Sequence, residues 1–316
     1  MSVKQVHRIL SGKYLVFLLF ILLAFFARIL AGVTSREYIP WIVLVIQVGI
    51  SVLILHINHE YRIIEKRTFV PAILFLLTTA SNTALYNNLQ GNISALAILL
   101  CLSFILKNYH QSQSQVSSFN IALILTLVSV FCRQALILYV PLFWIGFQWF
   151  RSFNARTFFA SILGITTVYL FLFAWYLYNS DWESFQEKFL QLKEIFTVNW
   201  IEVQWADWVA GAFIVFLLIL SAVDIFMLGF SEKIRTTLFF KFLYLLFIVS
   251  SVLACFFHSV SGDIQIINSI FISFLVGYYF TMSNNKWVAY LFIFTILFFV
   301  VFYILSCNVA LYIIYS

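Results

Sequence analysis

The sequence predicts an all-α fold: a polytopic integral membrane helix bundle of about eleven transmembrane helices. Three observations predict it. The chain is 64% hydrophobic and only 9% charged, whereas a soluble domain carries about 25% charged residues. Its hydrophobic runs are continuous, as at 14–26 and 290–305, which is typical of spanning helices and not of alternating barrel strands. Lys and Arg also alternate in density from one connecting loop to the next, as loops on alternate sides of a membrane do.

Each run is expected to form one helix, because lipid offers no partner to a backbone amide or carbonyl. Lys4, Arg8 and Lys13 precede the first run without a cleavage pattern behind it, which indicates an uncleaved first helix. The fourth to sixth runs are short. The fifth and sixth flank Arg133 and Gln134, and they form either two short crossings or a re-entrant hairpin. The expected spans are 14–31, 40–57, 69–86, 93–107, 118–132, 135–150, 158–178, 207–228, 237–257, 266–282 and 287–314.

The charges predict an orientation with the N-terminus inside and the C-terminus outside. In that orientation the inner segments hold 13 of the 18 basic residues and the outer segments hold four, with Arg28 near the outer end of the first span. Positive charge concentrates in cytoplasmic loops of membrane proteins. The four outer basic residues are Arg36, Arg133, Lys188 and Lys193.

The longest loop, 179–206, is predicted to lie outside and to contain an amphipathic helix. Ser180 and Glu183 have the spacing of a capping box. Apolar residues then recur at helical spacing, as expected of a helix that lies in the membrane interface. Its role is either an anchored linker or a lid over an outward-facing site. We find no sign of a soluble domain, so 1–316 is expected to be a single transmembrane domain. The apolar stripe is Trp182, Phe185, Phe189, Leu192 and Phe196.

Polar residues near the outer helix ends are the candidate site, because polar side chains within a membrane are costly. The planar forks of Arg28, Arg36 and Arg133 suit the phosphate of a lipid carrier. Glu37 and Asp263 are the candidate catalytic bases. The other candidate substrate-binding residues are Asn82, Gln134 and His258.

A structural alternative stands beside each of these roles. Arg28 and Arg36 also suit snorkelling to lipid headgroups, with Glu37 paired locally. Asn82 follows a run of small hydroxyl residues that also suits close helix packing. Arg133 has little loop around it, so it is expected to find an anion, carbonyls or water in an outward cavity.

No cofactor or metal is expected. There is no Walker A sequence, Gly-rich dinucleotide loop or G-x-S-x-G. The segment His56-Ile-Asn-His-Glu60 does not match H-E-x-x-H. The four cysteines fall inside apolar runs without C-x-x-C spacing, which argues against a zinc site or a disulfide framework. The basic residues are scattered over many loops, so nucleic acid is not an expected partner.

Two inner-loop segments carry a resemblance: Arg62-Ile-Ile-Glu-Lys-Arg-Thr-Phe-Val-Pro-Ala72 and Ser231-Glu-Lys-Ile-Arg-Thr236. On these segments the chain resembles an uncharacterised family of polytopic inner-membrane proteins of Gram-negative bacteria, with a similar helix pattern over residues 50–300. The polar outer helix ends also resemble membrane glycosyltransferases that use polyprenyl-phosphate sugars. Those enzymes usually carry an acidic residue in a long first outer loop. Here that loop is short and Glu37 is its only acid.

The resemblance implies a multi-pass protein of the bacterial inner membrane. The leading expectation is that it handles a lipid-linked envelope glycan precursor at the outer face, whether or not it is an enzyme. Its expected partners are membrane lipid, a lipid-linked sugar and an envelope protein. The alternatives are a non-catalytic subunit or scaffold of an envelope complex, and a transporter.

Overall fold

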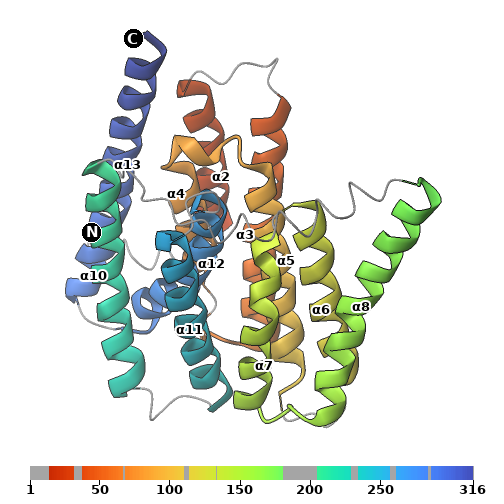
Figure 1. The fold of residues 1–316 in the computed structure, drawn as a ribbon. Coiled ribbons are helices and arrows are strands. Elements are labelled where there is room, and N and C mark those ends of the chain that lie inside the picture. The colour runs from red at the N-terminus through yellow and green to blue at the C-terminus, as the bar shows by residue number, and fades with distance from the viewer. Residues whose placement is uncertain are drawn as a thin grey trace. The chain divides into compact units, whose positions relative to one another are not determined.

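The computed structural model describes residues 14–31, 38–66, 68–109, 114–132, 134–180, 205–228, 234–256, 261–283 and 286–315. These residues form eleven α-helices, two 3-10 helices and no strand, which confirms the all-α fold class (Figure 1). The elements are α2 (Tyr14–Leu30), α3 (Tyr38–Tyr61), α4 (Val70–Ala80), η1 (Thr83–Leu85), α5 (Leu89–Lys107), α6 (Gln115–Phe131), η2 (Gln134–Leu138), α7 (Tyr139–Trp149), α8 (Ala155–Tyr178), α10 (Trp205–Leu228), α11 (Ile234–Phe256), α12 (Ser261–Met282) and α13 (Lys286–Tyr315).

Seven helices in the described ranges are long and apolar enough to cross a bilayer: α3, α5, α8, α10, α11, α12 and α13. The chain is therefore a multi-pass membrane protein. The helices α2, α4 and α6 and the η2–α7 segment are apolar but shorter. The crossing of all eleven hydrophobic runs stays a prediction. So do the two alternatives for α6 and η2–α7, which are two short crossings or a re-entrant hairpin.

The contacts divide the chain into two compact units. Unit 1 comprises 1–92, 202–233 and 268–316, and unit 2 comprises 93–201 and 234–267. The boundary falls within α5 and within α12. We expect residues 1–316 to fold as a single transmembrane domain, and this expectation stays a prediction.

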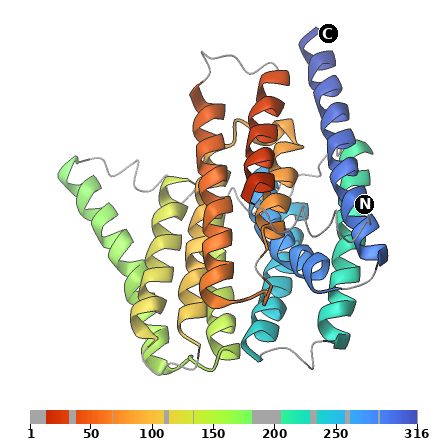
Figure 2. The same cartoon turned by 180° about the vertical axis from the view of Figure 1, so that it is seen from behind.

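The short helix α4 is the core of unit 1. Every residue from Val70 to Thr79 is buried, and α4 contacts α2, α3 and α13. Eleven residues span about 16 Å, roughly half of a hydrocarbon core of about 30 Å. Figure 2 shows α2 and α3 side by side in this unit. Because its neighbours cover it, α4 can end at Ala80 without exposing its backbone to lipid.

The start of α4 is fixed against the end of α12. A Cβ on Gly277 would lie 2.8 Å from Pro71 Cγ, so only glycine allows this close approach. Lys66 Nζ donates to the Thr281 carbonyl at 3.1 Å and satisfies one of the last carbonyls of α12. The start of α4 and the end of α12 therefore lie together.

After Ala80 the helix breaks, so the prediction of one continuous span over 69–86 is wrong. Asn82 adopts an extended conformation, and its side chain accepts from Ala84 N at 3.0 Å, which caps η1. The Ser81 hydroxyl donates back to the Thr78 carbonyl at 3.0 Å. Short polar side chains that bond their own backbone compete with helix formation. They are the physical reason for the break.

Unit 2 is organised by the packing of α6 against α8. A Cβ on Gly164 would lie 2.7 Å from the Phe119 carbonyl oxygen, so the two backbones nearly touch. Ser118 Oγ donates to the Thr157 carbonyl at 2.7 Å. Asn154 and Thr157 form a capping box at the start of α8. Figure 1 shows α6 and α8 together at the start of α8 and diverging along it.

A second contact in unit 2 joins α7 and α11. The rings of Phe143 and Phe242 meet edge-on with centroids 5.6 Å apart. A Cβ on Gly146 would lie 2.8 Å from Phe242. A small residue on α7 is therefore what lets the aromatic side chain of α11 pack against the helix.

Two helices begin four or more residues before the predicted start of their span. The fourth span begins at Leu89 and not at 93, and the tenth begins at Ser261 and not at 266. Asp263, expected in a loop, therefore lies in the first turn of α12, where an acid is favourable. The polar residues at these starts lowered the hydrophobic signal without ending the helix.

Candidate functional site

Arg28 is the central residue of the candidate site in unit 1. It lies near the end of α2 and is fully buried, at 0% exposure. Its Nη2 donates to Gln47 Oε1 at 2.7 Å, and its Nη1 donates to the Ala24 carbonyl at 3.1 Å. Within the described residues no carboxylate pairs with it. An arginine that snorkels would extend to the headgroups, so the snorkelling interpretation of Arg28 is wrong.

The third neighbour of the guanidinium is an aromatic ring. Arg28 Cζ lies 4.5 Å from the centroid of Tyr86, which is within the range of a cation–π interaction. Tyr86 follows η1, and its hydroxyl donates to the Ala80 carbonyl at 2.5 Å. The helix break after α4 therefore positions the ring that Arg28 faces. Asn82, predicted to bind substrate, caps this same turn.

The helix α13 also contacts this region. Tyr303 donates its hydroxyl to the Ala27 carbonyl at 2.5 Å, and Thr83 and Ser306 share a hydroxyl–hydroxyl hydrogen bond of 2.8 Å. These contacts tie α13 to α2 and to η1. The polar cluster thus draws on the late parts of α2 and α13, on α3 and on η1.

An apolar groove of about 270 Å³ adjoins this cluster. It is lined by α2, α4 and α13, and Ser81 and Tyr303 are its polar lining residues. Ala24, whose carbonyl accepts from Arg28, also lines it. The volume is close to the lower end of ligand pockets, about 300–1,000 Å³, which suits part of one hydrocarbon chain.

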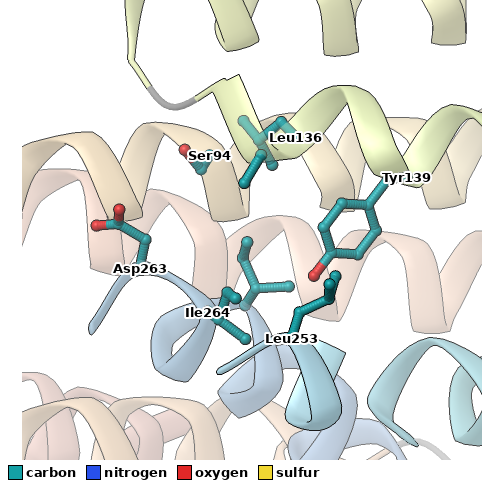
Figure 3. A pocket seen from close by; sticks show the side chains of 8 residues that line it. Ser94, Leu136, Tyr139, Leu253, Asp263 and Ile264 are labelled. Carbon is teal, nitrogen blue, oxygen red and sulfur yellow. The ribbon is translucent and has the colours of Figure 1, made fainter. Parts of the chain in front are cut away.

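Asp263 belongs to a separate, smaller cavity inside unit 2. It is 2% exposed and lines a space of about 10 Å³ together with Ser94 and Tyr139. That is close to the room one water molecule needs. Figure 3 shows the Asp263 carboxylate and the Tyr139 hydroxyl apart, with Leu136 and Ile264 among the apolar side chains around them. The role of Asp263 as a catalytic base stays a prediction.

Several predicted site residues lie outside the described part of the chain: Arg36, Glu37, Arg133 and His258. Gln134 begins η2, and its side chain is also outside the description. The structure therefore brings Arg28 and Asn82 to one region of unit 1 and places Asp263 in unit 2. The outward cavity that Arg133 is predicted to share with at least one of Glu37, Asp263, Asn82 and Gln134 stays a prediction; Ala135 and Leu136, close to Arg133 in the sequence, line the Asp263 cavity.

Sequence reasoning missed three residues of the site: Gln47, Tyr86 and Tyr303. Gln47 offered a signal, because it is an amide within a long apolar run and is 1% exposed in the structure. An amide in a transmembrane helix needs a polar partner. Tyr86 and Tyr303 gave no comparable signal, since tyrosine is common among the aromatic residues of this chain.

The described residues contain no group of three or more His, Cys, Asp or Glu side chains that could hold a metal ion. His56 Nε2 and Glu60 Oε2 lie 3.1 Å apart within one turn of α3, as an exposed pair. The polar chemistry of the site is thus that of a cation, an amide and phenol hydroxyls.

The fold and the site define a multi-pass helical membrane protein with a buried cation beside an apolar groove. Comparisons with protein-family models, with curated proteins and with solved structures found no match. The function is therefore argued from the site alone.

Proposed function

We propose that this protein handles a lipid-linked envelope glycan precursor, of the polyprenyl-phosphate class, at the outer face of the bacterial inner membrane. The hydrocarbon chain of the lipid occupies the groove between α2, α4 and α13. The N-in, C-out orientation of eleven spans is part of this proposal. It would place the late parts of α2 and α13 towards the outer side.

The observation that supports the proposal is that Ala24 lines the groove and also hydrogen-bonds Arg28, which lies buried behind the groove wall. An amphiphile with an anionic head needs an apolar channel that ends at a cation. Ala24 joins the two features, because it lines the groove and its carbonyl accepts a hydrogen bond from the Arg28 guanidinium. A cation retained inside a membrane protein points to function, since an unpaired charge in hydrocarbon costs several kcal/mol.

A second candidate function is transport, favoured by the break between α4 and α5. Transporters build their sites from discontinuous helices at membrane depth, and residues 81–88 interrupt the helical path here. The two functions differ in outcome. A transporter moves a solute across a sealed vesicle, whereas a precursor-handling protein changes the amount or structure of a lipid.

The test is a groove-filling variant, Ala27→Phe. Ala27 lines the groove, so an aromatic side chain there occupies part of the space proposed for the lipid. Cells that lack the protein should accumulate a lipid-linked precursor, measured by mass spectrometry of lipid extracts. Wild-type protein should reverse the accumulation, and Ala27→Phe should not.

The matched control is Ala174→Phe, which makes the same change at an exposed position of α8. It should reverse the accumulation as the wild type does. Both proteins must reach wild-type abundance in the membrane for the comparison. Equal rescue by Ala27→Phe and Ala174→Phe would contradict the proposed role of the groove.

A further inference from the structure

Arg28 and Gln47 form a pair whose hydrogen-bonding capacity is only partly used. The guanidinium is a donor and never an acceptor. The Gln47 oxygen must therefore face Arg28, and its Nε2 must point elsewhere. The donor-only guanidinium therefore fixes the orientation of the Gln47 amide.

Two donors of the pair are left over. Arg28 Nε and Gln47 Nε2 are both buried and lack a hydrogen-bond partner among the described residues. Buried polar groups are nearly always satisfied in native proteins, and each exception calls for an explanation. Because the two side chains hydrogen-bond each other, a single acceptor could serve both of these donors.

The acceptor must also carry negative charge. A water molecule could accept from both donors, but it would leave the arginine charge uncompensated, which is costly in a low-dielectric interior. Tyr86 compensates only in part, because the face of an aromatic ring brings no full negative charge to the guanidinium. An acceptor-only anion satisfies both donors and the charge together.

We propose that Arg28 Nε and Gln47 Nε2 form an oxyanion receptor for a phosphate group. A phosphate oxygen accepts charge-assisted hydrogen bonds well, and arginine favours such recognition. That this phosphate is carried by a lipid rests on the proposed function, because the lipid chain would lie in the adjoining groove. The receptor itself rests on the two unsatisfied donors, and it takes free phosphate by the same chemistry.

The test compares three probes on the full-length protein in nanodiscs of neutral phosphatidylcholine. They are a long-chain polyprenyl monophosphate, the matching uncharged polyprenol and inorganic phosphate. Wild-type protein should bind the phosphorylated lipid more tightly than the alcohol. Gln47→Glu places a carboxylate next to Arg28, where it competes with the phosphate. The ratio of the affinity for the phosphorylated lipid to the affinity for the polyprenol should fall by about tenfold or more, which corresponds to the loss of one hydrogen bond to a charged group. The affinity of Gln47→Glu for the polyprenol should stay within twofold.

Gln148→Glu is the matched control, because it makes the same charge change at an exposed position of α7, and it should keep the wild-type preference. Arg28→Lys is the second variant: it retains a cation but loses Nε, so it should also lose the preference. A preference that survives in both Gln47→Glu and Arg28→Lys overturns the receptor without touching the proposed function.

The remaining outcomes separate the two proposals. If wild-type protein binds neither lipid but is stabilised against heat by inorganic phosphate, and both variants lose this effect, the receptor holds and the lipid function fails. If polyprenol binds and phosphate on the lipid adds nothing in wild type, the groove holds and the receptor fails. An effect of phosphate that Gln148→Glu also abolishes reflects net charge alone and overturns the receptor.

Discussion

Gly164→Ala tests the packing that holds α6 against α8. The added Cβ would lie 2.7 Å from the Phe119 carbonyl oxygen and 3.1 Å from the Leu123 nitrogen. Both contacts are backbone atoms, which no rotamer change can move aside. The two helices must therefore separate, and hydrogen bonds such as Ser118 to Thr157 must lengthen with them.

The magnitude follows from two opposing terms. Overpacking at a site that cannot relax costs about 1–3 kcal/mol. Replacing a helical glycine by alanine contributes at most about 1 kcal/mol in the other direction. We expect Gly164→Ala to lower the free energy of unfolding by up to about 2 kcal/mol relative to wild type, and by about 1–3 kcal/mol relative to a glycine-to-alanine change at an uncrowded helical position.

The control is Gly49→Ala, because a Cβ on Gly49 meets nothing within 4 Å. It should be neutral or stabilising. Thermal unfolding of the purified variants in nanodiscs measures both. Equal stability of Gly164→Ala and Gly49→Ala would refute the close approach of α6 and α8.

Three further predictions concern residues that lie outside the described part of the structure and follow from the sequence alone. Single cysteines at Gln113 and Gln191 should be labelled by impermeant reagents from the inner and outer sides respectively, and the reverse pattern would refute the N-in orientation. Phe189→Glu should release the predicted 181–196 helix from the membrane surface, because it places a charge on the apolar face; unchanged depth-dependent quenching of a probe at Phe185 would count against that helix. Arg133→Lys and Arg133→Ala should both fail in a complementation assay if Arg133 binds phosphate through its planar fork, whereas full activity of Arg133→Ala would exclude a phosphate role.

The helices were predictable because each hydrophobic run has one way to satisfy its backbone in lipid. The break after Ala80 was not, because Ser81 and Asn82 are polar residues that helices in membranes also accept. Only the tertiary cover around α4 allows the chain to leave the helix there.

The site was predictable in part. Arg28 was found, because a charge inside a hydrophobic run is a strong signal. The direction of the Arg28 side chain was not predictable, because the same sequence is compatible with outward snorkelling and with inward binding. What turns it inward is Gln47, which lies 19 positions later on the next helix. Pairs across helices depend on rotation about each helix axis, which the apolar pattern of a membrane span specifies weakly.

Photocrosslinking from the groove tests the central claim most directly. Val300 lines the groove and Val301, its neighbour on α13, does not, while both side chains are exposed on the surface of the protein. Benzoylphenylalanine at each position would capture lipid from native membranes, and mass spectrometry would identify it. Position 300 should capture polyprenyl phosphate or its glycan-linked form, and position 301 should capture bulk phospholipid. The same bulk phospholipids at both positions would contradict the account.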